Sequence, residues 1–493
     1  MKLAALLSPW IAQAIPNCDI TELHNDSRQV KSGSLFIAYP GAATDGRMYI
    51  QQAVKSGAAA IIYEPNALPS TVGLPETIPC IPIPHLFSLL ADIAGRFYEN
   101  PTQSLAVTGV TGTNGKTTIA YQLAQAHALL GQAAMYIGTL GQGNVEDLKP
   151  LVNTTPDALC VQHLFHEYKK QHIRQVCMEV SSHALAEGRV AGVDFIQAIY
   201  TNLSHEHLDY HHTMQAYAET KAKLFMTPTL QWAILNYDDQ YAKQMDLGRH
   251  PQCKRLTYGL HEGSDVYATN CQLSMTGSEF DVKSPWGDRH VRIKSIGAFN
   301  IYNSLAVYSS LLAHGYAIDD VVSVMAQLNP SPGRMELVAE EPCVLVDYAH
   351  TPDALENVLS TLVRLKSHDT FSRKIWVVFG CGGDRDKTKR PLMGRIASQL
   401  ADHVVLTSDN PRTEEPVQIV EEIAEGLLST VNVIKVIDRT EAIKQTLNSA
   451  NKQDIILIAG KGHEAYQQIG HERFVFSDQE VVREALSGLK HCN

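Results

Sequence analysis

The chain has 493 residues, which is too long for one hydrophobic core and favours roughly three domains. Its composition, with 44% hydrophobic and 19% charged residues, is that of an ordinary globular protein and excludes extensive disorder. The formal net charge of -11 excludes a general attraction to nucleic acid or to an anionic membrane, so any bound phosphate requires a local site.

The amino terminus carries one lysine and a short apolar run that ends at Ser8-Pro9, which is too little for a signal peptide. The chain has no stretch of about 18 consecutive apolar residues, so we expect no transmembrane helix and a cytoplasmic location. Its nine cysteines show neither CxxC pairs nor a Cys/His metal spacing, which indicates reduced thiols rather than a disulfide framework. Cys381 lies near a glycine-rich motif, but a small core residue is the simpler interpretation.

Two polar, turn-forming stretches, residues 100–104 and 328–334, divide the chain. No internal repeat or low-complexity tract interrupts the segments between them. We therefore predict three domains with the boundaries 1–100, 101–333 and 334–493.

The strongest motif is a strand, a glycine-rich turn and a helix start between residues 105 and 118. Glycines let backbone N–H groups face phosphates, the lysine of the turn reaches the β and γ phosphates, and the next threonine can bind Mg²⁺. The usual spacing has a glycine where Val110 stands, so this is a variant P-loop. A tight turn alone would explain the glycines but not the Lys-Thr-Thr sequence at 116–118. We expect a helix from about Thr117 and ATP contacts from Thr111, Gly112, Thr113, Asn114, Gly115, Lys116 and Thr117.

Two polar clusters follow apolar runs of the central segment, at residues 178–183 and 201–211. Mg²⁺ prefers carboxylate and water oxygens, so Glu179 is a candidate ligand and His207 an unusual but possible one. The neighbouring histidines leave Zn²⁺ open, although they lack a recognised zinc spacing. A surface or structural role for each histidine also remains open.

In the last segment, stretches of helical character separate five apolar runs, at 344–346, 375–379, 404–406, 433–437 and 455–459. Such runs are typical of fully buried parallel strands joined by crossover helices, which predicts a doubly wound, Rossmann-like α/β domain. Polar clusters follow three of these strands, at residues 380–386, 408–412 and 460–464. Because ligands collect at the carboxyl ends of parallel strands, we expect one binding edge there.

In combination and in this order, the motifs resemble the Mur ligase family over essentially the whole chain. They are Asp26-Ser27-Arg28, 41–47, 111–118, 153–155, 179–183, 201–204, 207–211, 297–300, 333–336, 347–350, 409–412 and 460–464. The resemblance implies an α/β protein of three domains. They are an amino-terminal UDP-substrate domain, a central P-loop ATPase-like domain with a mostly parallel sheet, and a carboxyl-terminal amino-acid-binding domain.

The resemblance also implies an ATP-dependent ligase that activates a carboxylate as an acyl phosphate and couples it to an amine. The implied substrates are UDP-N-acetylmuramoyl-L-alanyl-D-glutamate and meso-2,6-diaminopimelate, with ATP and Mg²⁺ as cofactors, in peptidoglycan precursor synthesis. A monomer without nucleic-acid or membrane partners is expected. L-Lysine as the amino acid, a folate polyglutamate ligase, a P-loop phosphotransferase or motor ATPase, and a non-catalytic nucleotide-binding scaffold remain alternatives.

Further ATP contacts are implied for Asn300, Arg334, Asp347 and His350. Lys221 matches a lysine that the family carries as a carbamate, a carboxylate-like group able to hold Mg²⁺ together with Thr117, Glu179 and His207. From the residues alone, Lys221 would be a helix-surface lysine. The implied catalytic residues are Lys116, Lys221 and His207, and domain closure is expected during the reaction.

The UDP-linked substrate is implied to contact residues of the first two domains: Asn25, Ser27, Ala42, Ala43, Thr44, Asn153, Thr154, Thr155, Ser181, Glu187 and Arg189. Glu187 stands where the resemblance would place glutamine, and Glu206 where it would place aspartate. Arg28 and Arg47 are explained equally well as ordinary surface charges.

Diaminopimelate differs from lysine by a carboxylate beside its distal amine, so a selective site needs a cation for that group and an acceptor for the amine. Arg412 offers a planar guanidinium suited to a carboxylate, and Arg385 is placed to hold the other carboxylate. The ammonium is expected at Glu464, with Asp409 and Gly460 nearby, and the motif adds Asn410 and Pro411. Alternatively, Arg412 pairs with Glu414 or Glu415 on the following helix.

Overall fold

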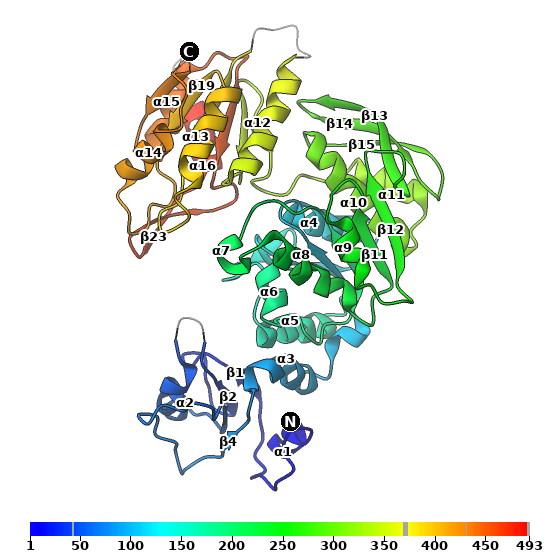
Figure 1. Ribbon diagram of the computed structural model, residues 1–493, viewed down its shortest axis with the longest axis vertical. Coiled ribbons are helices and arrows are strands. Elements are labelled where there is room, and N and C mark those ends of the chain that lie inside the picture. Colours follow the sequence, from blue (N-terminus) through cyan, green and yellow to red (C-terminus); the bar gives the residue numbers. More distant parts are fainter. Residues whose placement is uncertain (42–43, 368–372, 430, 491–493) are drawn as a thin grey trace.

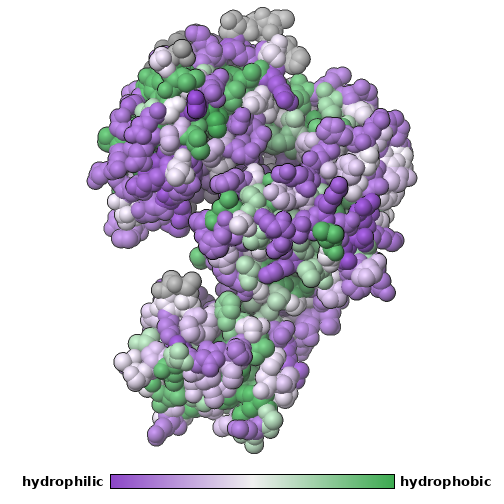
Figure 2. All heavy atoms as spheres, viewed as in Figure 1, coloured by the Kyte–Doolittle hydropathy of each residue, from purple (hydrophilic) through white to green (hydrophobic). Residues whose placement is uncertain are grey.

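The computed structural model describes residues 1–41, 44–367, 373–429 and 431–490. The amino-terminal unit lies at one end, and the central and carboxyl-terminal units lie side by side at the other (Figure 1). The visible surface is mainly hydrophilic, with a wide indentation between the amino-terminal and carboxyl-terminal units (Figure 2). Among the described helices, none combines the length and apolar character that a membrane span requires.

The amino-terminal unit is built on a parallel sheet whose strands are β1 (Glu22–His24), β2 (Ser34–Ala38), β3 (Ala60–Tyr63) and β4 (Cys80–Pro82). Around it lie α1 (Leu3–Leu7), the 3-10 turn η1 (Gly46–Tyr49), α2 (Ile50–Lys55) and α3 (Leu86–Phe97). In α3, Leu86, Leu90 and Ile93 recur at helical spacing and form one buried face. They join a core with Ala158 and Leu159 of the central unit, so apolar packing links the two units.

The central unit has a sheet of order β15-β14-β13-β12-β11-β10-β5-β9-β6-β7-β8. Its parallel part contains β5 (Ala106–Thr111), β6 (Ala134–Gly138), β9 (Gln175–Glu179), β10 (Phe195–Tyr200), β11 (Trp232–Asn236), β12 (Lys254–Gly259) and β13 (Val266–Ser274). Antiparallel strands extend both edges, β14 (Gly277–Lys283) and β15 (Arg289–Ile293) on one side, β7 (Gly141–Asn144) and β8 (Asp147–Lys149) on the other.

Helices cover both faces of this sheet because successive residues of a strand point to opposite sides. Ile199 and Ile234 pack in the core formed with α4 (Lys116–Leu129), α10 (Ala298–His314) and α11 (Ile318–Met325). Their neighbours Ala198 and Ala233 pack in the opposite core, formed with α5 (Ala158–Lys170), α8 (Met214–Ala222) and α9 (Ala242–Leu247). Four shorter elements complete the unit: η2 (Pro101–Ser104), α6 (Ser182–Ala186), α7 (Leu208–His211) and η3 (Lys223–Met226).

The carboxyl-terminal unit has a sheet of order β16-β17-β21-β18-β19-β20 and is doubly wound. Its strands are β16 (Glu336–Ala339), β17 (Cys343–Asp347), β18 (Ile375–Phe379), β19 (His403–Leu406), β20 (Asn432–Lys435) and β21 (Ile455–Ala459). One face carries α12 (Pro352–Ser367), α13 (Lys389–Leu400) and α14 (Pro416–Ala424), and the other carries α15 (Arg439–Ser449) and α16 (Asp478–Lys490). A separate hairpin is formed by β22 (Tyr466–Ile469) and β23 (Glu472–Val475).

The predicted fold class and the five predicted strands of this unit are confirmed, with two differences. The run expected at 433–437 is not fully buried, because β20 lies at the sheet edge and its residues are exposed or half-buried. The other edge holds β16, an antiparallel strand that the apolar runs did not predict.

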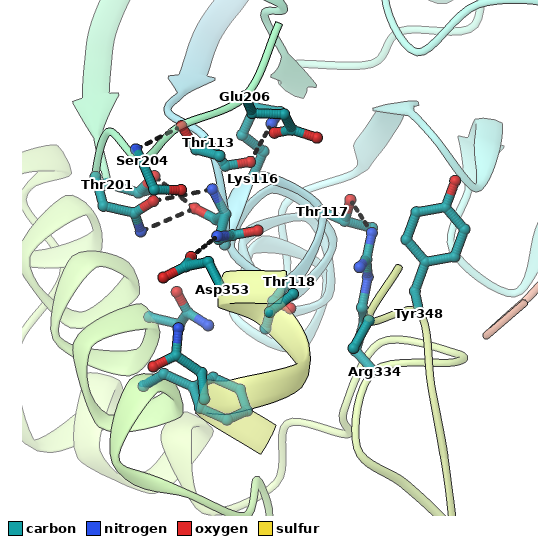
Figure 3. Close-up of a pocket in the computed structure, with 18 of the residues that line it drawn as sticks. Thr113, Lys116, Thr117, Thr118, Thr201, Ser204, Glu206, Arg334, Tyr348 and Asp353 are labelled. Atoms are coloured by element: carbon teal, nitrogen blue, oxygen red, sulfur yellow. Dashed lines mark hydrogen bonds between the residues drawn. The ribbon is translucent and has the colours of Figure 1, made fainter. Parts of the chain in front are cut away.

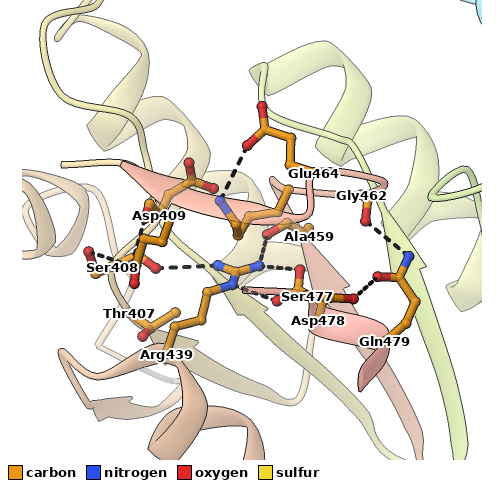
Figure 4. A network of polar contacts seen from close by, with 12 residues as sticks. Thr407, Ser408, Asp409, Arg439, Ala459, Gly462, Glu464, Ser477, Asp478 and Gln479 are labelled. Carbon is orange, nitrogen blue, oxygen red and sulfur yellow. Dashed lines mark hydrogen bonds and ion pairs between the residues drawn. The ribbon is translucent and has the colours of Figure 1, made fainter. Parts of the chain in front are cut away.

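A buried ion pair ties α15 to α16 beneath the ends of the parallel strands (Figure 4). Arg439 and Asp478 are both fully buried, with Nε–Oδ1 and Nη2–Oδ2 distances of 2.7 and 2.8 Å. Arg439 also donates to the main-chain oxygen of Ala459, the last residue of β21, at 3.0 Å.

We expect Asp478→Ala to lower the free energy of unfolding by about 3–5 kcal/mol, because it leaves a buried guanidinium unpaired. Glu421→Ala is the matched control: it breaks an ion pair with Lys435 whose side chains are 58% and 40% exposed, and a change within about 1 kcal/mol is expected. Urea unfolding followed by circular dichroism measures both, and equal losses would contradict the structural role of the buried pair.

Candidate active site

The glycine-rich turn joins β5 to α4, and the helix begins at Lys116, one residue before the predicted start. Gly115 has φ +89°, a conformation that favours glycine. At Gly112, a Cβ atom would lie 1.8 Å from Oγ1 of Thr201, so only glycine allows this close approach. The backbone of the turn is therefore shaped to leave room for a ligand at the helix start.

The end of β10 holds the turn in place (Figure 3). Thr201 Oγ1 donates to the main-chain oxygen of Asn114 at 2.6 Å, and the main-chain nitrogen of Asn114 donates to Asn202 Oδ1 at 3.0 Å. The main-chain nitrogen of Ser204 donates to Thr113 Oγ1 at 3.1 Å. Thr201, Asn202 and Ser204 line the cavity, although they were not among the predicted site residues. The Thr-Asn-Leu-Ser motif was the available signal.

Two lysines meet at the turn. Lys116 Nζ donates to the main-chain oxygens of Gly112 and Thr113 at 2.9 and 2.8 Å. Lys221 Nζ donates to the same oxygen of Gly112 at 2.9 Å and is 1% exposed, so it is not a helix-surface lysine. Desolvation lowers the pKa of both amines, and for Lys221 the positive charge of Lys116 lowers it further, while Glu206 opposes the shift.

Glu179 ends β9 with a fully buried carboxylate. Its Oε1 accepts from the Tyr136 hydroxyl at 2.5 Å and from the main-chain nitrogen of Thr139 at 2.8 Å. Its Oε2 accepts from Thr117 Oγ1 at 3.0 Å, which places a carboxylate beside the P-loop hydroxyl. Burial and the Glu179 charge raise the pKa of Tyr136 well above its ordinary value, so the tyrosine remains a donor.

A cavity of about 570 Å³ lies over the P-loop and is lined by both the central and the carboxyl-terminal unit. Arg334 reaches Thr117 Oγ1 with Nη2 at 3.4 Å, and its guanidinium lies 4.4 Å from the ring centre of Tyr348. Its Nε is buried and has no hydrogen-bond partner among the described residues. A half-buried guanidinium with an unused donor fits an anionic ligand in this cavity.

The predicted ATP residues divide into two groups. The cavity is lined by Thr113, Asn114, Gly115, Lys116, Thr117, Arg334, Asp347 and His350. It is not lined by Thr111, Gly112 or Asn300. Asn300 is buried and donates to the main-chain oxygen of Ile296 at 2.9 Å, whereas Phe299, Tyr302 and Asn303 from the same segment face the cavity. The motif thus adjoins the cavity through Phe299, Tyr302 and Asn303 rather than through Asn300, and its part in ATP binding stays a prediction.

The predicted metal ligands Thr117, Glu179 and His207 line this cavity. Lys221 is not among the lining residues, and its amine donates to the main-chain oxygen of Gly112. His207 Nε2 lies 3.8 Å from Glu206 Oε2, and His350 Nε2 lies 3.9 Å from Glu206 Oε1. Within the described chain, no three His, Cys, Asp or Glu side chains are arranged to hold a metal by themselves.

The predicted UDP-substrate residues lie in two places. In the amino-terminal unit, Asn25 donates to Tyr39, Ser27 donates to Gln52, and Thr44 bonds with Tyr49, while Ala42 and Ala43 lie outside the described residues. Arg28 is exposed, as expected for a surface charge, but Arg47 is 4% exposed and donates to the main-chain oxygens of Glu64, Asn66 and Ala67. Arg47 therefore fixes a loop.

The second group adjoins the cavity. Thr154 and Ser181 line it, Thr155 Oγ1 donates to the main-chain oxygen of Glu179 at 2.9 Å, and Asn153 is exposed. Arg189 donates to the main-chain oxygen of Thr155 at 3.1 Å and pairs with Glu187 at 2.6 Å. The carboxylate at 187 thus orients Arg189.

The three polar clusters of the carboxyl-terminal unit meet at one edge, as predicted. Asn410 Nδ2 donates to Glu464 Oε2 at 2.8 Å, and Arg412 Nη1 donates to the main-chain oxygen of Gly383 at 2.7 Å. A Cβ at Gly383 would lie 1.9 Å from the main-chain oxygen of Pro411, so this close approach requires glycine. The main-chain nitrogen of Gly460 donates to the main-chain oxygen of Asp347, a residue that lines the cavity, at 3.1 Å.

Arg412 does not pair with a following glutamate. Glu414 bonds instead with Arg390 and Lys387, and no ion pair to Arg412 occurs in the described part of the chain. Arg385 is exposed and lines a second cavity of about 500 Å³ together with Asp209 of the central unit. Asp409 is buried beside this edge, and its Oδ1 accepts from the main-chain nitrogen of Asn410 at 2.7 Å.

Three domain models match the chain in succession: the Mur ligase family catalytic domain at 19–98, the Mur ligase middle domain at 110–311, and the Mur ligase glutamate ligase domain at 333–462. A UDP-N-acetylmuramoyl-L-alanyl-D-glutamate–2,6-diaminopimelate ligase from Pseudomonas putida is 44% identical over 494 residues, covering 98% of each chain. A solved structure of a ligase with that same name has 36% identity and a TM-score of 0.71, and covers 100% of this chain and 99% of that one. A MurF ligase from Thermotoga maritima in complex with ADP, at 20% identity, shares the fold with a TM-score of 0.66 over 96% of this chain and 98% of that one.

Proposed function

Because the chain belongs to the Mur ligase family, we propose that it is the ATP-dependent ligase that adds 2,6-diaminopimelate to UDP-N-acetylmuramoyl-L-alanyl-D-glutamate. The reaction forms an amide bond in peptidoglycan precursor synthesis. The observation that carries the proposal is the cavity over the P-loop, which the central and carboxyl-terminal units line together. Relatives of nearly equal length that carry the same enzyme name support it.

Several finer properties belong to the same proposal. The diaminopimelate is the meso isomer, the protein acts as a cytoplasmic monomer, and Mg²⁺ accompanies ATP. The domains are 1–100 for the UDP-linked substrate, 101–333 for ATP and 334–493 for the amino acid, and the last two close further around the substrates. Side-chain contacts already join them, among them Arg334 with Thr117 at 3.4 Å and Asn114 with Asp353 at 3.1 Å.

ATP binds with its phosphates on the turn that precedes α4, where main-chain N–H groups and the helix start attract anions. Lys116 exchanges its main-chain contacts for phosphate oxygens, and Arg334 offers its unused Nε from the other unit. Phe299, Tyr302 and Asn303 form the part of the cavity wall that is suited to the adenine.

The oxygens beside the turn fit Mg²⁺, since a hydroxyl and a carboxylate are ligands that this ion prefers. Thr117 and Glu179 would hold it, with His207 and a carbamate on Lys221 as the remaining protein ligands. When bound, the ion would neutralise phosphate charge.

In the first step, the terminal carboxylate of the UDP-linked dipeptide attacks the γ-phosphorus of ATP, which forms an acyl phosphate and releases ADP. Two anions must approach each other, so Lys116 and Arg334 contribute mainly by neutralising charge. Arg189, held by Glu187 and the Thr155 main chain, is placed to orient the dipeptide near Ser181 and Thr154. In the second step, the neutral amine attacks the acyl carbon, phosphate leaves, and the amine loses a proton.

The amino acid binds at the edge formed by 383–385, 409–412 and 460–464. Arg412 holds the distal carboxylate, Glu464 receives the distal ammonium, and Arg385 contacts the other carboxylate. Gly460 adjoins Asp347 of the ATP cavity, so the reacting amine of a ligand at this edge lies toward the phosphates.

Phosphate release from ATP tests the function. We expect release only when both the UDP-linked dipeptide and free diaminopimelate are present, with formation of an equal amount of the tripeptide product. Release with ATP alone would favour a motor ATPase or a phosphotransferase. Release that depends on a folate substrate and glutamate would favour a folate polyglutamate ligase, and no release under any of these conditions would favour a scaffold.

A further inference from the structure

Lys461 places a fully buried cation beside Glu464, at the edge proposed to bind the amino acid. Its Nζ donates to Asn410 Oδ1 at 3.1 Å and to Glu464 Oε2 at 3.2 Å. The rings of Tyr466 and Phe476 lie 5.6 and 5.8 Å from it, which surrounds the ammonium with negative ring faces. No role for this residue was predicted from the sequence.

The two oxygens of Glu464 have different surroundings. Oε2 accepts both from Lys461 and from Asn410 Nδ2, whereas Oε1 has no hydrogen-bond donor among the described residues. Asn410 is fixed in turn, because its Oδ1 also accepts from the main-chain nitrogen of Gln468 at 2.8 Å. One oxygen of Glu464 is thus committed to the protein, and the other is available to a ligand.

We propose that Lys461 is a positioning residue for Glu464: it holds Oε2 and thereby presents Oε1 to the distal ammonium of the incoming amino acid. The inference rests on the proposed function, since it assigns the carboxylate to that ammonium. Without Lys461, Glu464 must lose more side-chain freedom when the ligand binds, and its orientation is no longer set in advance. The contact is remote from the reacting amine, so binding suffers and the chemical step does not.

Lys461→Met tests this role, because it removes the ammonium and keeps the length of the side chain. We expect KM for diaminopimelate to rise about tenfold, the equivalent of one charge-assisted hydrogen bond, with kcat within about twofold of wild type. 2-Aminopimelate has both carboxylates but lacks the distal amine. Its KM is expected to stay the same in the variant, because it makes no use of Glu464. Lys452→Met gives the matched control, because Lys452 is exposed and lies just before β21, the strand that Lys461 follows.

A double-mutant cycle distinguishes positioning of Glu464 by Lys461 from a general structural role of Lys461 in residues 409–412 and 460–464. In a Glu464→Gln background, Lys461→Met should change KM for diaminopimelate by less than about twofold, since the oriented carboxylate is already gone. If Lys461→Met does not fold, Lys461→Gln keeps a donor without the charge, and the same pattern with a smaller rise in KM is expected.

An equal rise in KM for both amino acids, a fall in kcat alone, or an unchanged KM for diaminopimelate would overturn the inference while leaving the proposed function intact. If wild-type protein does not ligate diaminopimelate at all, the proposed function fails first. The two failures are therefore distinguishable within one set of assays.

Discussion

Lys116→Ala is expected to reduce ligation by at least about a thousandfold, because the phosphate site loses the cation that stabilises the transferred group. The fold should persist. In the structure, Lys116 Nζ bonds with two main-chain oxygens of its own turn, and Thr201, Asn202 and Ser204 hold that turn independently. Phosphate release with both co-substrates present measures the loss, and circular dichroism checks the fold.

Lys149→Ala is the matched control, since Lys149 is exposed on the edge strand β8 of the same unit and should retain full activity. Turnover near the wild-type rate in Lys116→Ala would overturn the assignment of the turn as the ATP phosphate site.

Lys221→Ala is expected to lose about a hundredfold or more of the ligation rate, because the carbamate on this lysine supplies a negative oxygen ligand for Mg²⁺. Lys221 is buried, and its amine lies against the P-loop carbonyl of Gly112. Carbamylation adds CO2 to the neutral amine and releases a proton, which turns a cation into an anion at this position.

The substitutions separate two roles of Lys221. If the carbamate acts, Lys221→Glu or a short added carboxylate restores part of the activity lost in Lys221→Ala, and Lys221→Arg stays inactive. If an ammonium that holds Gly112 is what matters, Lys221→Arg keeps activity and Lys221→Glu does not. Labelled bicarbonate should enter active wild-type protein at this residue, and an unmodified Lys221 in active protein would defeat the carbamate prediction.

The sequence predicted most of the carboxyl-terminal sheet because its inner strands are buried on both faces and therefore read as continuous apolar runs. The edge strand β16 lacks this signal: its four residues are all half-buried, and it was not foreseen. The other edge strand, β20, was predicted from its apolar run although its residues are exposed or half-buried.

The P-loop was recognised from the local spacing of its residues. The orientation of Asn300, which does not line the cavity, could not be predicted in this way. Once α10 begins at Ala298, Phe299, Tyr302 and Asn303 follow the spacing i, i+3 and i+4 and share one face, while Asn300 points elsewhere. The motif indicated which segment to consider, whereas the residue at which α10 begins determines which of its side chains face the cavity.

Burial of single charged residues depended on contacts that no local pattern contains. Arg47 is buried by a loop some 20 residues away, and Lys221 by a turn 109 residues away. Lys461 meets Asn410 across 51 residues because the strands before them end at the same edge. Such residues are explained only after the strand order is known.

The central claim, ligation of diaminopimelate rather than L-lysine, is tested most directly by kcat/KM for the two amino acids side by side. Lysine would leave the guanidinium of Arg412 without a carboxylate, so wild type should prefer diaminopimelate by roughly a hundredfold or more. Arg412→Ala should lose most of that preference by weakening the use of diaminopimelate. Equal use of L-lysine by wild-type protein would contradict the account.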